Sequence, residues 1–196
     1  MSGETIAVLR CRRGFTAQKT FTAEGEKAWS ECWEFDHEER VCLGIGEFGP
    51  ILEETERDPR ALIIRRKLKS HLNPGHPVRR MSNGPGACFD EYPRHLTGID
   101  IDDTLAPEGM SPISDEALDY AVSRLPPEFH NVSYVAQFSS KAGLSRSGRK
   151  IKAHLWFGLS TPATSEQMRR GAESTNGLAD PALYKTVQPH YTSRPP

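Results

Sequence analysis

The sequence predicts a mixed α+β (α/β) domain, because short β-rich runs alternate along the chain with two well-delimited amphipathic helices. The chain has 196 residues, of which 36% are hydrophobic. It is therefore long enough for one compact domain, or two small lobes, around a buried core. β-Rich runs occur at Thr5–Leu9, Val41–Phe48, Ala61–Leu68, Leu96–Asp102, Val132–Phe138 and Ile151–Leu159.

The first predicted helix begins after Ser114, a favourable N-cap, and continues through the run DEALDYAVSRL. Leu118, Val122 and Leu125 form its apolar stripe, and two prolines follow it. The second predicted helix covers Thr164–Glu173, with Thr164 or Ser165 as its cap.

A Gly/Pro-rich stretch, Asn73–Ala87, has the composition of a connector. It divides the chain into an N-terminal β-rich lobe, residues 1–90, and a C-terminal lobe, residues 91–196. The final residues HYTSRPP contain no closing element. We expect either an irregular tail or a domain cut from a longer protein.

Composition excludes several classes of protein. No stretch approaches the roughly 20 apolar residues of a membrane span, and the N-terminus lacks the apolar core of a secretory signal. The four cysteines form no C-x-x-C pair, which favours reduced thiols and a cytoplasmic location.

The net charge of −1 conceals an uneven distribution. Residues 24–58 are strongly acidic, whereas residues 60–80 hold seven basic side chains and no acidic one. A second basic cluster comprises Arg146, Arg149, Lys150 and Lys152. Each cluster alone is typical of a solvated surface, and together they could follow a phosphate backbone.

The strongest local signal is the run LTGIDIDD at residues 96–103. Strand alternation places Ile99 and Ile101 on a buried face and Asp100 and Asp102 together on the other, about 7 Å apart at Cα. Two neighbouring carboxylates repel each other, and Mg²⁺ or Mn²⁺ would relieve that repulsion. An exposed strand end is the equally weighted alternative.

The second signal is the run IKAHLWFGL at residues 151–159. Its odd positions are all apolar, so alternation displays Lys152, His154 and Trp156 on the opposite face. This strand is expected to form a hairpin with the preceding run. The joining loop KAGLSRSGR is suited to phosphate contact through its backbone N–H groups, although it could be merely flexible.

The third region is the run DPALYKTVQPHYTSRP at residues 180–195. Asp180 and Pro181 are typical of the N-cap and the first position of a helix. For Asp180 this role has at least as much weight as metal ligation. Gln188, His190 and Tyr191 could contact a nucleotide or lie in a surface tail.

A D-x-D strand, a Ser-rich hairpin with a strand-borne His and a later acidic residue together resemble the archaeo-eukaryotic primase superfamily. The segments FSSKAGL, KAHLWFGLSTP and DPALYKTVQPHYTSRP are similar to its phage and mobile-element primase-polymerase branch. The resemblance covers residues 96–196. It implies a two-lobed primase-polymerase fold whose RRM-like sheet carries the catalytic residues, in a domain that usually precedes a helicase.

The resemblance implies DNA-templated nucleotidyl transfer, for primer synthesis or DNA polymerisation, by a mechanism using two Mg²⁺ or Mn²⁺ ions. The implied catalytic residues are Asp100, Asp102, His154 and Asp180, the three carboxylates being metal ligands. Glu173 and Asp103 are the alternatives for the third carboxylate. The implied nucleotide-binding residues are His154, Ser139, Ser140, Arg146, Arg149, Lys150 and Lys152.

The expected partners are nucleoside triphosphates, a single-stranded DNA template and a helicase domain or protein. Arg65, Arg66, Lys67, Arg79 and Arg80 are expected to face the template. Trp156, Tyr191 and Tyr92 are the candidate platforms for base stacking.

Two other functions remain open on the same residues. A metal-dependent nuclease would use the carboxylates and the ion to activate water. A non-catalytic replication-initiation or single-stranded DNA-binding module would bind DNA without a metal-dependent product. A His-based relaxase is disfavoured because the strand offers only His154, whereas such sites need paired metal-binding histidines.

Overall fold

The computed structural model describes residues 3–17, 20–22, 25–27, 32–73, 75–81, 83–144, 148–185 and 187–192. All strand pairs in this part of the chain are antiparallel, so the fold is of the mixed α+β class, as predicted. The elements, in chain order, are β1 (Glu4–Cys11), β2 (Thr20–Thr22), β3 (Gly25–Lys27), β4 (Phe35–Cys42), α1 (Ile45–Arg57), β5 (Ala61–Ile64), β6 (Lys67–Leu68), β7 (Phe89–Asp90), β8 (Arg94–Leu105), α2 (Asp115–Ser123), η1 (Pro127–Phe129), β9 (Tyr134–Phe138), β10 (Lys150–Ala163), α3 (Ser165–Glu173), η3 (Pro181–Tyr184) and β11 (Pro189–Tyr191).

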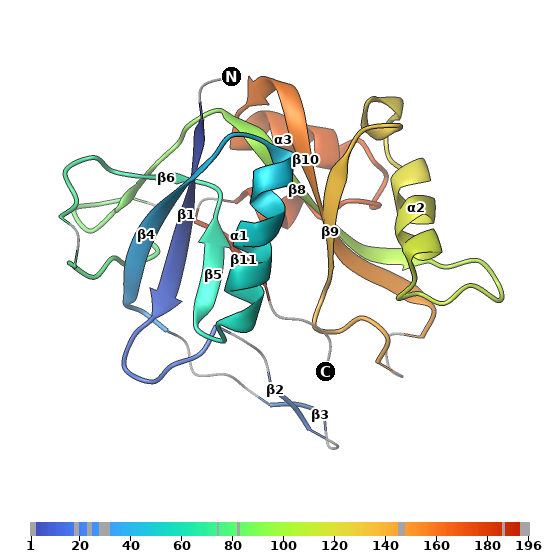
Figure 1. Cartoon of the computed structure of the whole chain (residues 1–196), viewed down its shortest axis with the longest axis horizontal. Coiled ribbons are helices and arrows are strands. Elements are labelled where there is room, and N and C mark those ends of the chain that lie inside the picture. The colour runs from blue at the N-terminus through green and yellow to red at the C-terminus, as the bar shows by residue number, and fades with distance from the viewer. Residues whose placement is uncertain are drawn as a thin grey trace.

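Two sheets form the body of the molecule (Figure 1). The first has the strand order β11-β5-β1-β4, and the second has the order β8-β10-β9. Helix α1 lies between the two sheets, and α2 covers the outer face of the second (Figure 1).

The second sheet has a hydrophobic core on each face. Ile99, Leu155 and Phe157 pack with α2 on the outer face. On the inner face, the Trp156 ring packs against Phe48 of α1, with ring centroids 4.6 Å apart. The alternation predicted for residues 151–157 is therefore correct, but both faces of β10 are covered.

The caps predicted for two helices are confirmed. The Ser114 hydroxyl accepts a hydrogen bond from the Ala117 backbone N–H at the start of α2. Thr164 and Gln167 form a reciprocal capping box at the start of α3. Helix α3 ends at Glu173, as the sequence predicts, whereas α2 ends at Ser123, two residues before the predicted Leu125.

The strand predicted at Val41–Phe48 is wrong. Strand β4 ends at Cys42, and α1 begins three residues later. Phe48, Ile51, Leu52 and Thr55 form the buried stripe of α1 at helical spacing. Pro50 and three nearby glycines, which are poor helix formers, obscure this spacing in the sequence.

The irregular tail expected at the C-terminal end is also wrong for the residues that the structure describes there. Residues 189–191 form β11, which pairs with β5 of the N-terminal sheet. The chain thus returns across the predicted lobe boundary at residue 90, and that division into lobes stays a prediction. In the described part of the chain, no helix has the length and apolar character needed to cross a membrane.

Replacement of Trp156 by Ala is expected to destabilise the fold by about 3–5 kcal/mol, because it opens a cavity between the sheets. Trp156 is only 4% exposed, whereas Trp33 is 71% exposed. The matched change Trp33→Ala should alter the free energy of unfolding by less than about 0.5 kcal/mol. Urea denaturation measures both, and equal effects would contradict the packing described.

Candidate functional site

The candidate site lies where β8 and β10 pair on their inner face. Asp100 of β8 lies opposite His154 of β10 in the register of the two strands. The His154 Nε2 atom is 3.4 Å from the Asp100 Oδ1 atom. The predicted pairing of a D-x-D strand with a His-bearing hairpin strand therefore brings carboxylate and imidazole into contact.

A register shift orients the second carboxylate. Ala153 pairs with Ile101 and Ile151 pairs with Thr104, so Asp102 and Asp103 both lie opposite the single residue Lys152. Such a bulge redirects side chains. The Lys152 ammonium contacts the Asp102 carboxylate and lies 2.9 Å from the Asp102 carbonyl oxygen.

The Asp103 side chain lies outside the site. Its carboxylate forms an ion pair with Lys150 at 2.5 Å, and both side chains are well exposed. Neither residue lines the pocket that contains Asp100. Lys150 and Arg149, which were expected to bind nucleotide, are thus not brought to the site, and Arg146 lies outside the described residues.

Five of the predicted site residues line a single pocket of about 180 Å³. The lining consists of the predicted Asp100, Asp102, Ser139, Ser140 and His154, together with Ala17, Lys141 and Tyr191. These residues come from the loop after β1, from β8, β10 and β11, and from the turn after β9, so distant parts of the sequence meet here. Lys141 and Ala17 were not predicted, because nothing in their local sequence distinguishes them.

The turn after β9 holds the two serines. The Ser139 N–H donates to the Lys152 carbonyl at 2.9 Å, and the Ser139 carbonyl accepts from Ala142 at 2.8 Å. The Lys141 N–H donates to the Ser139 hydroxyl at 3.3 Å. These bonds hold Ser139 and Ser140 at the pocket, as the predicted hairpin requires.

His154 is buried, and the expectation that it is displayed to solvent is wrong. The residue is 9% exposed, because the N-terminal sheet covers the inner face of β10. In the described part of the chain, its Nδ1 atom is buried without a hydrogen-bond partner. His154 nevertheless lines the pocket.

Burial and charge act against each other in the Asp100–His154 pair. Burial alone would raise the pKa of Asp100, but the charge and the hydrogen bond of His154 outweigh it and hold that pKa below its usual value. Burial would lower the pKa of His154, but the charge and hydrogen bond of Asp100 outweigh it and raise that pKa. The pair is therefore favoured in its ionised form.

His190 lies beside this pair, and its pKa is shifted in the opposite direction from that of His154. It is 2% exposed, and its ring lies 4.7 Å from that of Trp156. Burial, followed by the positive charge of His154, lowers the pKa of His190 to about 3. Among the described residues, neither ring nitrogen has a hydrogen-bond partner. His190 is thus a neutral core residue, not a nucleotide contact in a surface tail.

Asp180 does not join the two carboxylates. Its exposed side chain accepts a hydrogen bond from the Ala182 N–H at 2.8 Å, and Pro181 is the first residue of η3. The helix-cap interpretation is therefore confirmed. Only the backbone of Asp180 approaches the site, its N–H donating to the Asp100 carbonyl at 3.0 Å.

A three-carboxylate metal centre does not fit these positions. Among the described residues, no group of three or more His, Cys, Asp or Glu side chains could hold an ion. Asp100 and Asp102 are the two carboxylates that line the pocket. Two carboxylates do fit Mg²⁺, which usually takes one or two carboxylates and completes its shell with water and substrate phosphates.

Two residues expected at the DNA template are structural. The Arg65 guanidinium donates to the carbonyl oxygens of Leu96, at 2.9 Å, and Ala163, at 2.5 Å. Arg66 forms an ion pair with Glu91 at 2.6 Å, and only 17% of its side chain is exposed. Arg65 thus joins β8 to the end of β10, and Arg66 is held by the segment between β7 and β8.

The other basic residues expected at the template are dispersed. Lys67 lies over the Tyr92 ring at 5.5 Å. Arg79 pairs with Glu34 at 2.9 Å. Arg80 lines a separate pocket on the N-terminal sheet. Of the candidate stacking residues, Trp156 is buried, so that expectation is wrong, whereas Tyr92 is half exposed and Tyr191 lines the site.

Comparisons with known proteins return no match: no family model fits the chain, and neither the curated proteins nor the solved structures contain one similar to it.

In metal-free buffer, His154 is expected to titrate above the usual histidine pKa of about 6.5, whereas His190 should stay neutral until the pH approaches 3. Asp100→Asn should lower the pKa of His154, because burial is then opposed only by the weaker effect of the Asp102 charge. NMR titration of the imidazole signals measures both. An unchanged His154 pKa in Asp100→Asn would contradict the pairing.

The same shift fixes the sign of a stability effect. Because folding raises the pKa of His154, protonated His154 stabilises the fold fully below pH about 6.5 and progressively less as the pH rises through its folded pKa. The stability difference between wild type and His154→Gln should shrink over that range.

Proposed function

We propose that the protein catalyses DNA-templated nucleotidyl transfer from nucleoside triphosphates, as a primase-polymerase. The observation that carries this proposal is the single pocket shared by the D-x-D carboxylates, the serine turn and His154. These are the residues on which the resemblance to archaeo-eukaryotic primases rests. The proposal keeps two of the three carboxylates that the resemblance implies and omits Asp180.

The pocket suits the phosphate end of a nucleotide. Its volume of about 180 Å³ is below the roughly 300–1,000 Å³ of pockets that enclose whole small molecules. Protonated His154, the Lys141 side chain and the hydroxyls of Ser139 and Ser140 offer donors to phosphate oxygens. A triphosphate would therefore enter with its base and sugar outside.

Asp100 and Asp102 would hold a divalent cation, which supplies Lewis-acid activation of a 3′-hydroxyl and neutralises charge on the phosphates. The two carboxylates are already paired with cationic side chains, His154 and Lys152. These pairs orient both carboxylates across the β8–β10 ladder, and the charge and hydrogen bond of His154 keep Asp100 ionised. Lys152 would then be free to contact phosphate when Asp102 binds the ion.

The proposed reaction also indicates the partners of the protein and its location in the cell. Template copying requires single-stranded DNA, so the partners are that strand, nucleoside triphosphates and a helicase that exposes it. We place the reaction in the cytoplasm, in the replication of a phage or mobile element.

The first test is incorporation of labelled nucleotides on a single-stranded template with Mg²⁺ or Mn²⁺, with and without a primer. Asp100→Asn and Asp102→Asn should each lower the incorporation rate by about 100-fold or more, because each removes a charge that would bind the cation. Primer dependence distinguishes polymerase from primase activity.

Asp103→Asn is the matched control for that test. It removes one carboxylate from the same strand, but Asp103 lies outside the pocket, so incorporation should be near wild type. Cleavage of DNA without added nucleotides would indicate the nuclease instead. DNA binding with no metal-dependent product would indicate the non-catalytic module.

A second test concerns nucleotide binding by His154. His154→Gln should raise the Kd for a nucleoside triphosphate by about 10- to 100-fold, because a charge-assisted hydrogen bond is lost. Its binding of single-stranded DNA should not change. Titration with a fluorescent nucleotide measures the first, and His76→Gln, at an exposed histidine outside the pocket, is the control. Equal loss of nucleotide and DNA binding would refute this role.

A further inference from the structure

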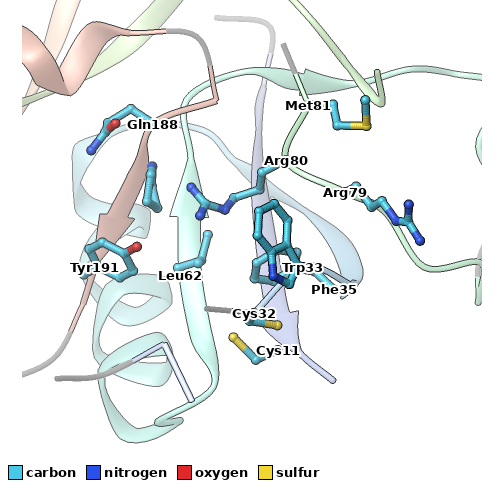
Figure 2. Close-up of a pocket in the computed structure, with 11 residues that line it drawn as sticks. Cys11, Cys32, Trp33, Phe35, Leu62, Arg79, Arg80, Met81, Gln188 and Tyr191 are labelled. Carbon is cyan, nitrogen blue, oxygen red and sulfur yellow. The ribbon is translucent and has the colours of Figure 1, made fainter. Parts of the chain in front are cut away.

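A second pocket, of about 520 Å³, opens on the face of the N-terminal sheet that points away from β8 and β10. Its floor includes Cys11 and Leu62, and its wall includes Trp33, Arg80 and Tyr191 (Figure 2). This pocket is large enough for a nucleotide unit of a nucleic-acid strand.

Trp33 presents an aromatic surface to solvent at this pocket. Its side chain is 71% exposed, and Met81 on the same rim is 40% exposed. An indole ring offers a large apolar face, and such rings stack on unpaired bases of any sequence. The Trp33 ring is therefore available for stacking on a base, because it is exposed and not packed in the core.

Arg80 supplies a cation to the same pocket. Figure 2 shows its guanidinium directed toward Leu62, between Trp33 and Tyr191. The Arg80 guanidinium donates a long hydrogen bond, 3.4 Å, to the Val187 carbonyl oxygen. Within the described part of the chain its Nε atom is buried without a partner, and no carboxylate pairs with it.

The neighbouring Arg79 differs in both respects. It pairs with Glu34 at 2.9 Å, and Figure 2 shows its guanidinium directed away from the centre of the pocket. Of the two adjacent arginines, only Arg80 is therefore placed to receive an anionic group inside the pocket.

Tyr191 connects this pocket with the candidate site. It lines both pockets, whereas the adjacent His190 faces the opposite side of β11 and packs on Trp156. The Tyr191 side chain is therefore common to the larger pocket and to the pocket of Asp100 and Asp102.

We propose that the larger pocket binds single-stranded DNA, with a base stacked on Trp33 and a backbone phosphate on Arg80, and that the strand continues over Tyr191 toward Asp100 and Asp102. This inference rests on the proposed function for the identity of the strand as template. A duplex would not fit, because its base faces are already stacked and cannot meet the Trp33 ring.

The test is binding of dye-labelled oligo-dT by fluorescence anisotropy, without nucleotides and with EDTA present. Trp33→Ala should raise the Kd by about 5- to 100-fold, and Trp33→Phe should restore most of the loss, because stacking needs only an aromatic face. Arg80→Ala should also raise the Kd. It should lower the slope of log K against log salt by about 0.7, the value for one phosphate contact on a single strand.

Arg170→Ala is the charge-matched control. Arg170 is exposed on α3 and lines neither pocket, so its removal should leave the Kd nearly unchanged. Thermal unfolding of each variant checks that the fold persists. Since Trp33 is exposed, its replacement should not disturb the core.

The proposal would be overturned if the wild-type protein bound double-stranded DNA as tightly as oligo-dT. It would also be overturned if Trp33→Ala and Arg80→Ala bound oligo-dT like wild type. Full competition by a mononucleotide would overturn it as well, because the pocket would then be a nucleotide site and not a strand site.

Catalysis is tested separately. Normal strand binding by the pocket variants, with incorporation that still depends on Asp100, would refute the strand site alone. Loss of strand binding in those variants, with no incorporation by wild type, would refute only the proposed function.

Discussion

The structure depends on one constraint: the inner face of β8 and β10, which carries their ionisable side chains, is also the face that packs against the N-terminal half of the molecule. Trp156 fills the middle of this interface, between Phe48 and His190. Buried Arg94 crosses it and donates to the Arg65 carbonyl oxygen at 2.8 Å. Because strand side chains alternate, His154 must lie on the same face as Trp156. It is buried for that reason, and Asp100 must offset the cost of its charge.

The two ladder pairs therefore have different electrostatic roles. Asp100 and His154 are largely removed from water, where an unpaired charge is costly, so each depends on the other. Asp102 is 57% exposed and its pair with Lys152 is more screened by solvent. The bulge at Asp102 and Asp103 separates these environments, because it ends the regular register where β8 leaves the interface. The Asp100 carboxylate is fixed by burial, whereas the Asp102 carboxylate can exchange Lys152 for another cation at a small cost in free energy.

The sequence predicts the second sheet and its helices well, because alternation and caps are local signals. It predicts α1 poorly, since Pro50 and nearby glycines mask a buried stripe. It assigns His154 to the correct face but gives it the wrong exposure. Alternation shows which residues share a face, whereas what covers that face is set by tertiary packing. The cover includes His190, from a segment with no strand signal of its own. The cap role of Asp180 was visible in the sequence, but only the geometry removes it from the metal ligands.

The short strand β11 contributes to both pockets, because Tyr191 lines each of them. Successive side chains of a strand point to opposite faces. His190 therefore faces the sheet interface, whereas Pro189 and Tyr191 face the larger pocket. Three residues paired to β5 alone form a weakly anchored edge. The neutral His190 ring packs on Trp156, which adds a buried contact to the pairing with β5. One three-residue strand thus forms part of the interface beside Asp100 and His154 and part of the surface proposed to hold the template.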